Sequence, residues 1–286
     1  MAADGDKRTV IISANCHGRF LRRSLGRTPI GEQYEVVWAR EMGRLGHDRL
    51  PDQAIERCAI LLEQIGHETT GLAGAERLPA DCQVIRFPIV WLNSLWPMHC
   101  ADPRSPNNGP EDRGRFPYGD RLILRYLEEG ASPEVAVDRW FAADASQMKK
   151  LDRYHEINAA KARQLDLDAD VKLGAFVLDR FRRERLFVSF NHPTPRMLLH
   201  MARQLCEAMG YRDVEPVIPR ANAGGIGDIH APIHPAVAAH FGLEWWGPGD
   251  LYRHFEDSLT AREYLLRYAA FAPIGLGAAP AVAAAS

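Results

Sequence analysis

Short apolar strands alternate with helical segments over the first hundred residues, and this alternation constrains the fold more than any other feature. The β-branched run 9–13 predicts a buried strand, and 19–25 places its apolar residues on one helical face. Further strands are predicted at 34–38 and 82–87. Strands separated by helices pair in parallel, so the sequence predicts an α/β fold whose parallel-sheet core resembles a doubly wound sheet.

A helix is predicted between the second and third of these strands. Ile55, Cys58, Leu62 and Ile65 keep the 3-4-3 spacing of an apolar stripe that faces a core. Cys206 lies on a similar stripe in a later helix, and both cysteines are therefore expected to be small core residues.

Four regions are predicted along the chain. Residues 1–117 form the α/β portion, and within it 88–117 is a proline-rich segment without periodicity whose aromatic first half should line a pocket. Residues 118–185 form a helical subdomain inserted between sheet elements, 186–274 return to the α/β core and end in helices, and 275–286 are a disordered tail. The expected helices are 120–129, one capped by Ser132, 147–165, 171–183, one begun by Thr194 and Pro195, and one opened by a capping box at Thr260.

The composition is that of an ordinary globular protein. The chain of 286 residues, 46% of them apolar, is long enough to bury a sizeable core, and its net charge of −2 gives no general attraction for nucleic acid. No apolar run reaches 18 residues, and 1–8 lacks the apolar segment of a signal peptide, so we expect a cytoplasmic protein without an integral membrane segment. The five cysteines are scattered without a Cys-x-x-Cys pair, which indicates neither a disulfide framework nor a structural zinc site.

Cys16 follows the first strand and begins a helix, at the edge of the sheet where open α/β folds bind their ligands. The helix dipole and a neighbouring His17 or Arg19 would favour the thiolate, which makes Cys16 a candidate nucleophile. The alternative is a half-buried thiol that ends a strand and has no chemical role.

A second polar turn follows the predicted strand 186–190. His192 in this turn is a candidate general base, because imidazole titrates near neutral pH, and Asn191 would orient it or bind an oxyanion. Ser189, two residues upstream, is a weaker hydroxyl candidate. Alternatively, Asn191 and His192 only satisfy backbone groups before a helix.

Arginines and tryptophans near these turns are candidates for ligand binding. Arg19, Arg22 and Arg23 crowd the helix after the first turn, whose N-terminus attracts anions, so they either hold a phosphate or face solvent. Trp91 and Trp96 lie in the segment without periodicity and either stack on a sugar or pack as core or lid residues.

Three other features are less specific. The segment 224–228 is glycine-rich, but no clear strand precedes it, so it is interpreted as a turn and not as a dinucleotide-binding fingerprint. His230 and His234 are separated by Pro232, and no carboxylate completes a metal-binding pattern, so no metal is expected. Asp120 either caps the helix that it begins or orients a histidine, and capping is favoured.

Four short motifs occur in the order that a known family shows. They are Asn15-Cys16-His17, Phe87-Pro88, Tyr118-Gly119-Asp120 followed by Gly130 to Glu134, and Asn191-His192-Pro193. In these motifs, which span about two-thirds of its length, the chain resembles the WcbI-type capsular-polysaccharide acetyltransferase family. One residue departs from that pattern, because His17 stands where glutamine is expected. The position of Cys16 also looks like that of the nucleophile in serine esterases of the Ser-Gly-Asn-His type, which implies an SGNH-like sheet.

The resemblance implies an acyltransferase that binds coenzyme A. Its small-molecule donor would be acetyl-CoA, and its acceptor would be a sugar hydroxyl of a surface polysaccharide. Together with the chemistry above, the resemblance makes Cys16, His17, Asn191 and His192 the expected catalytic residues. The expected CoA-binding residues are Asn15, Gly18, Arg19, Arg22, Arg23, Trp91 and Trp96.

Two versions of the transfer are consistent with these residues. In the first, His192 deprotonates the acceptor hydroxyl, which attacks the thioester while amides after Cys16 and Asn15 or Asn191 stabilise the oxyanion. In the second, Cys16 takes the acetyl group first. Two other functions stay open: an esterase that removes acyl groups from a carbohydrate, and a non-catalytic module that binds CoA or polysaccharide. The sequence does not identify the acceptor sugar, the acyl chain or the oligomeric state.

Overall fold

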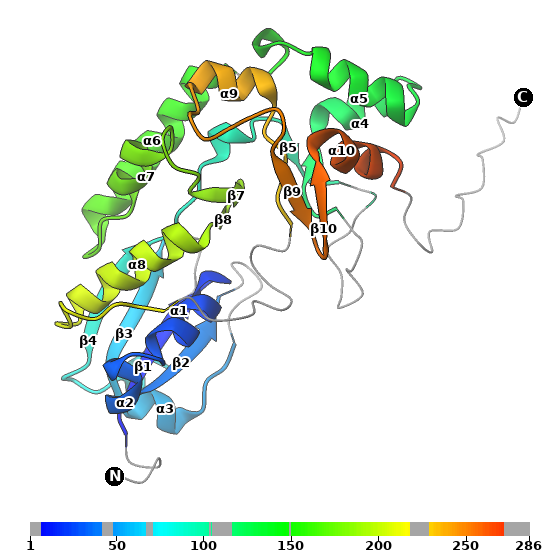
Figure 1. Ribbon diagram of the computed structural model, residues 1–286. Coiled ribbons are helices and arrows are strands. Elements are labelled where there is room, and N and C mark those ends of the chain that lie inside the picture. The colour runs from blue at the N-terminus through cyan, green and yellow to red at the C-terminus, as the bar shows by residue number, and fades with distance from the viewer. Residues whose placement is uncertain are drawn as a thin grey trace, which may run out of the picture.

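A four-stranded parallel sheet forms the N-terminal part of the molecule (Figure 1). Its strands are β1 (Thr9–Ala14), β2 (Glu35–Arg40), β3 (Cys58–Ile65) and β4 (Gln83–Pro88), in the order β2-β1-β3-β4. The computed structural model describes residues 7–41, 48–66, 71–102, 104, 116–148, 150–217 and 229–271. The predicted α/β class with a parallel sheet is confirmed.

The helix predicted around 55–65 is wrong. Helix α3 (Asp52–Glu56) is short and ends before Cys58, where β3 begins. β3 lies between β1 and β4, and its first five residues are buried, so neighbouring elements cover both of its faces. A strand buried on both faces is apolar without alternation, and such a run contains the helical spacing by default. Cys58 is therefore a strand residue, whereas Cys206 lies in a helix, α8 (Pro195–Ala208), as predicted.

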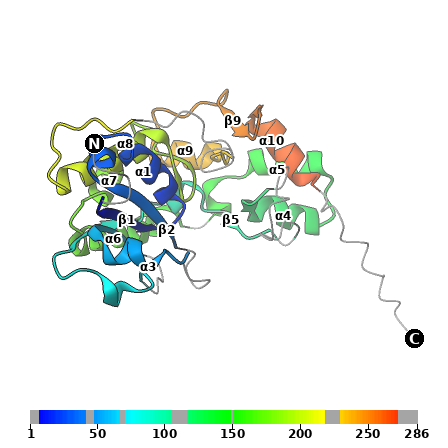
Figure 2. The same ribbon diagram turned by 90° about the horizontal axis from the view of Figure 1, so that it is seen from below.

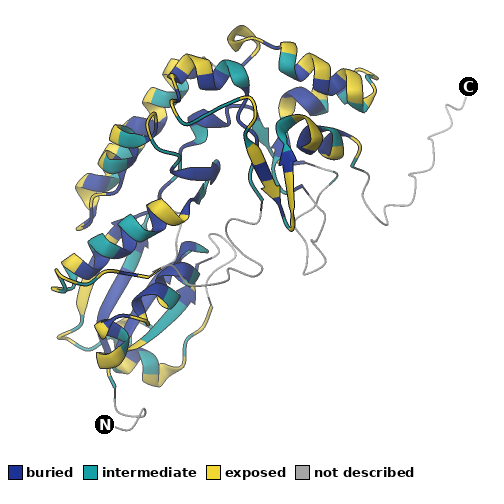
Figure 3. Ribbon diagram, viewed as in Figure 1, coloured by how far each residue is buried: buried dark blue, intermediate teal, exposed yellow. Residues whose placement is uncertain are grey.

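Helices cover the sheet on both sides. α1 (His17–Leu25) and α8 pack on the face that presents Val10 and Ile12, while α3 packs on the face that presents Ile11. Figure 3 shows β1 and β3 buried along most of their length, as expected for strands between two layers. The short helix α2 (Pro29–Gln33) leads from α1 into β2.

The helices between 118 and 185 form two groups. α6 (Leu151–Asp168) and α7 (Gly174–Arg180) pack on each other, and α6 contacts β4. α4 (Arg121–Glu128) and α5 (Pro133–Ala142) pack instead with α10 (Ala261–Ala269), away from the sheet (Figure 2). Helices thus lie at 120–129, 147–165 and 171–183, as predicted, with ends that differ by a few residues.

Short antiparallel ladders complete the fold. β7 (Phe187–Ser189) occupies the predicted strand 186–190, but it pairs with β8 (His192–Pro193) and adds no strand to the parallel sheet. The remaining elements are β5 (His99–Cys100) with β6 (Gly119–Asp120), β9 (Leu251–His254) with β10 (Asp257–Thr260), helix α9 (Pro235–Phe241), and 3-10 helices at Ala75–Arg77, Asn93–Leu95 and Ala145–Gln147.

The predicted helix caps are confirmed. Asp120 Oδ1 accepts the Leu122 and Ile123 amides at 2.8 and 3.1 Å. Ser132 and Thr194 cap α5 and α8, each with proline at the first helical positions, and Thr260 forms a capping box with Glu263. These signals are local, so the sequence is sufficient to place them.

Some features of the sequence lie outside the described residues: 105–115 of the proline-rich segment, the glycine-rich 224–228 and the tail 275–286. Among the helices that the structure describes, none has both the length and the apolar character needed to cross a bilayer.

Candidate active site

Cys16 lies two residues after the end of β1 and is the N-cap residue of α1. Asn15 organises this turn, because its Oδ1 accepts the His17 amide at 2.9 Å and its own amide donates to Gln64 Oε1 on β3 at 3.0 Å. The Gly18 amide donates to the Asn15 carbonyl at 2.9 Å. The two amides that follow Cys16 are thus already hydrogen-bonded, and neither is left to stabilise an oxyanion.

Gly18 is required by packing. A Cβ atom added at Gly18 would lie 2.3 Å from Nε1 of Trp38, and that indole nitrogen donates to the Ala14 carbonyl at 2.9 Å. The absence of a side chain therefore lets the β2 indole lie across the first turn of α1. This contact accounts for the glycine without any ligand.

The β7–β8 ladder places His192 beside Cys16. His192 Nε2 lies 3.8 Å from Cys16 Sγ, although 176 residues separate them in the chain. On the other side of the ring, Nδ1 lies 3.0 Å from Ser189 Oγ and is also hydrogen-bonded to the Tyr118 hydroxyl. The imidazole of His192 therefore bridges one thiol and two hydroxyl groups.

The role of Nε2 depends on the tautomer of His192. In the tautomer that carries its proton on Nδ1, this N–H donates to one of the two hydroxyl oxygens. The lone pair of Nε2 then points toward Cys16, which is the arrangement of a general base. Within the described part of the chain, no carboxylate contacts this ring, so an imidazolium would have no ionic partner.

Burial keeps all three titratable groups neutral at pH 7. Burial raises the pKa of the Cys16 thiol, and the nearby Arg40 opposes this rise only in part. Burial lowers the pKa of His192 to about 4 and raises the pKa of Tyr118 to about 12. The predicted thiolate at Cys16 and the predicted near-neutral titration of His192 are therefore wrong, because desolvation outweighs the helix dipole and the neighbouring charges.

His17 and Asn191 join the two turns. His17 is fully buried, and its Nε2 lies 3.3 Å from the Asn191 carbonyl while its Nδ1 lies 3.3 Å from Gln64 Nε2. His17 therefore holds the second turn against the first and points away from a position beside the thiol. The side-chain Oδ1 of Asn191 is buried and has no hydrogen-bond partner, so it is available to a ligand.

The arginines separate along α1. Arg19 lies in the first turn, near Cys16, whereas Arg22 and Arg23 lie in the last turn. These two line an open cleft of about 720 Å³ together with Lys7, Arg27 and Tyr34, at the opposite end of the helix. The structure does not bring Arg22 and Arg23 to the thiol, and instead places Arg40 there.

The two tryptophans lie in different surroundings. Trp96 is buried, donates from Nε1 to the Ala231 carbonyl at 3.0 Å, and lines a cavity that also contains Tyr118. Trp91 lies under the Lys161 ammonium group, 4.8 Å from the ring centre, and lines a separate, smaller cavity. Only Trp96 is therefore connected to the site.

Sequence reasoning missed three contributors to the site: Tyr118, Gln64 and Arg40. The sequence around Tyr118 indicates only the start of a helix. Its neighbours in the chain do not reveal that its hydroxyl contacts a histidine 74 residues later. Gln64 and Arg40 stand at the carboxyl ends of β3 and β2, so correct strand boundaries would have pointed to them. Among the described residues, no group of histidine, cysteine or acidic side chains is arranged to hold a metal ion, and His234 caps α9.

Comparison with known proteins identifies the family. A solved structure described as WcbI, a polysaccharide biosynthesis enzyme, in native form without a disulfide bond between coenzyme A and one of its cysteines, has the same fold with a TM-score of 0.65. It is 17% identical, and the match covers 92% of this chain and 89% of that one. The search of curated proteins gives no significant match. The family model for the polysaccharide biosynthesis enzyme WcbI matches residues 9–214, and the chain therefore belongs to the WcbI family.

Proposed function

We propose that this protein is a cytoplasmic O-acyltransferase that moves an acetyl group from acetyl-CoA to a sugar hydroxyl of a capsular or other surface polysaccharide. Its family acts in polysaccharide biosynthesis. The description of the similar solved structure refers to a disulfide bond between coenzyme A and a cysteine, which that native form lacks. The observation that carries the proposal is the 3.8 Å approach of His192 Nε2 to Cys16 Sγ at the carboxyl edge of the sheet.

His192 is the general base of this reaction. Its Nε2 takes the proton of the acceptor hydroxyl as that oxygen attacks the thioester carbonyl carbon. The carbon–sulfur bond then breaks, and the CoA sulfur leaves with the electron pair and takes the proton back from Nε2. Ser189 and Tyr118 hold the ring so that Nδ1 keeps its proton throughout.

The neutral state of Cys16 favours this direct transfer over a covalent acyl-enzyme. Only the thiolate is a strong nucleophile, and the pKa of this thiol is raised by burial. Cys16 then forms the floor of the site, on which the thioester sulfur lies.

The side chains around Cys16 suit a CoA thioester. Arg19 and Arg40 supply positive charge at this edge of the sheet, which would attract a donor that carries negative charge. The buried Oδ1 of Asn191 can accept a hydrogen bond from a neighbouring hydroxyl of the acceptor sugar and so orient the sugar toward His192.

Binding of CoA is the first test. Native mass spectrometry and calorimetric titration of the purified protein with CoA should show one CoA per chain. An Arg40→Ala variant should bind more weakly, and Arg125→Ala, at an exposed position on α4, serves as the matched control. Absence of CoA binding would reject the transferase and favour the esterase.

Variants of the two central residues separate the versions of the reaction. We expect His192→Ala to lose on the order of 10²-fold or more in turnover, the usual contribution of a positioned base. Cys16→Ala should retain turnover within about tenfold if the transfer is direct. An acetyl group found on Cys16 by peptide mass spectrometry, together with abolished turnover in Cys16→Ala, would establish the covalent version instead.

A further inference from the structure

A partly open cavity is lined by Tyr118. It encloses about 40 Å³, which is room for about three water molecules. We call it the aromatic cavity; six of the residues that line it are Trp96, Tyr118, Phe190, Ala231, Tyr264 and Leu265. These six residues come from five separate parts of the chain, which meet beside the active site.

The aromatic cavity borders the reacting groups. Tyr118 lines it, and the hydroxyl of the same side chain is hydrogen-bonded to His192 Nδ1. Phe190 packs edge-on against Tyr118, with ring centres 5.7 Å apart, and stacks on His99 at 3.9 Å. Tyr118 therefore belongs both to the wall of the cavity and to the hydrogen bonds of the imidazole.

The lining of the aromatic cavity excludes a phosphate group. Among the residues that the structure describes, no lysine or arginine lines it. Its carboxylate, Asp120, has both oxygens hydrogen-bonded, to the first amides of α4 and to Trp140 Nε1 at 3.0 Å. A phosphate would have no counter-charge there, and a sugar ring with several hydroxyls would lack partners for them.

One polar atom of the lining is unsatisfied. The hydroxyl of Tyr264 is buried and has no hydrogen-bond partner, which costs about 1–3 kcal/mol unless an oxygen atom occupies the space beside it. An apolar wall with one free hydroxyl suits a short alkyl chain accompanied by one water molecule.

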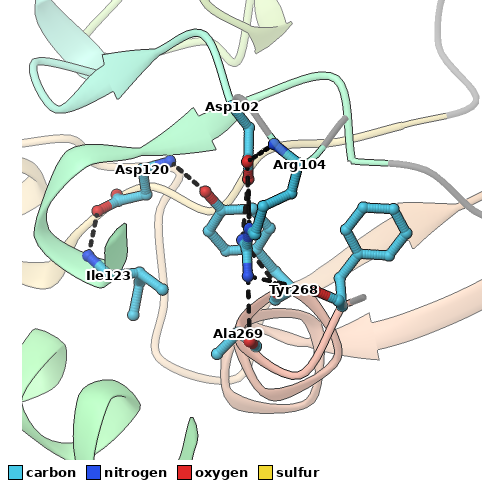
Figure 4. Close-up of polar contacts among 7 residues, drawn as sticks. Asp102, Arg104, Asp120, Ile123, Tyr268 and Ala269 are labelled. Carbon is cyan, nitrogen blue, oxygen red and sulfur yellow. Dashed lines mark hydrogen bonds and ion pairs between the residues drawn. The ribbon is translucent and has the colours of Figure 1, made fainter. Parts of the chain in front are cut away.

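The far wall of the aromatic cavity is fixed by polar contacts, which Figure 4 shows. The Tyr268 hydroxyl accepts the Asp120 amide at 3.0 Å. Arg104 pairs with the buried Asp102 at 2.8 Å and donates to the carbonyls of Tyr268 and Ala269 at the end of α10. These contacts fix the end of α10, the helix that supplies Tyr264, Leu265 and Tyr268 to the lining.

We propose that the aromatic cavity receives the acyl chain of the donor thioester and limits that chain to about two to four carbons. This inference rests on the proposed acyltransferase function and adds the length of the acyl group to it. The chain would pass beside Phe190, with the thioester at Cys16 and the alkyl end between Ala231 and Leu265.

The test measures dissociation constants for CoA, acetyl-CoA, butyryl-CoA and hexanoyl-CoA by calorimetry. The wild type should bind butyryl-CoA more tightly than CoA, by about fourfold per buried methylene, and should bind hexanoyl-CoA at least tenfold more weakly than butyryl-CoA. Two variants change the size of the cavity. Leu265→Ala enlarges the cavity and should restore hexanoyl-CoA binding. Ala231→Leu fills it and should remove the preference for acylated CoA while leaving CoA itself unaffected. Leu178→Ala, in the separate cavity at Trp91, is the matched control and should behave as the wild type.

The outcomes separate the two proposals. If the folded wild type binds no CoA compound, the proposed function fails and this inference fails with it. If CoA binds but both cavity variants, folded by circular dichroism, keep the wild-type ratios among the four ligands, only the inference is overturned. A chain-length profile that shifts in Leu265→Ala and not in Leu178→Ala supports it.

Discussion

Acidification tests the electrostatics of His192 directly. Burial holds the pKa of this imidazole at about 4 in the folded protein, against an ordinary value of 6.5. Between these values the unfolded chain binds a proton that the folded protein does not bind, so stability is present above pH 6.5 and falls as the pH drops toward 4. The difference, 6.5 − 4 or about 2.5 pH units, corresponds to about 3 kcal/mol at 1.36 kcal/mol per unit.

Urea unfolding of the wild type and of His192→Gln at pH 7 and pH 4.5 measures this contribution. Glutamine does not titrate and can still hydrogen-bond the hydroxyls of Ser189 and Tyr118. The wild type should lose about 2–3 kcal/mol more than the variant over this interval. Burial also lowers the pKa of His200 to about 4, but His200 is present in both proteins and cancels in the comparison.

Two results would refute this reasoning. One is an equal loss of stability in the two proteins. The other is a pKa near 6.5 for His192 itself, read from its ring carbon resonance by nuclear magnetic resonance. The same depressed pKa predicts that turnover stays constant from pH 7 down to about pH 5, where an unperturbed histidine base would already be protonated.

Three further perturbations have calculable outcomes. Gly18→Ala places a methyl group in contact with the Trp38 indole and should destabilise the protein by about 1–3 kcal/mol in urea unfolding, with a change in tryptophan fluorescence. Arg104→Met leaves the charge of Asp102 buried without its partner and should cost about 3–5 kcal/mol. Alkylation of Cys16 by iodoacetamide, followed by peptide mass spectrometry, should be slower at pH 7 than that of a free thiol and rise about tenfold per pH unit up to the raised pKa.

Each of these has a matched control. Gly247→Ala meets only a carboxylate oxygen at 3.7 Å and should change stability by less than about 0.5 kcal/mol. Arg86→Met removes an exposed ion pair with Glu63 and should cost at most about 1 kcal/mol. Arg40→Ala should slow alkylation of the active-site thiol further, because the arginine lowers the pKa of that thiol. Equal effects in variant and control would contradict the corresponding argument.

Local signals allowed much of the fold to be predicted from the sequence. The caps at Asp120, Ser132, Thr194 and Thr260 each depend on a few consecutive residues, and all four occur as expected. The strand 58–65 was assigned as a helix because its neighbours on both faces, and not its own spacing, determine its state.

The candidate site, like the fold, was predicted only in part from the sequence. Its two polar turns, at Cys16 and His192, were recognisable because each follows a strand and begins or precedes a helix. Ser189, three residues before His192, was also a candidate, whereas Tyr118 was not, since it reaches His192 only after distant segments have packed together. The sequence analysis also expects Arg22 near the thiol, whereas Arg22 lies in the last turn of α1, at the other end of the helix.

The sequence by itself determined the parallel α/β class, the positions of the two turns and most helix ends, because these depend on residues that are neighbours in the chain. Only the tertiary structure decided that β3 is a strand, that two hydroxyls hold the imidazole, and that thiol and imidazole are both neutral. Those properties arise from burial and from contacts between distant segments. The pKa of a group depends on how far the folded protein excludes water from it. The spacing of residues along the chain does not show how complete that exclusion is.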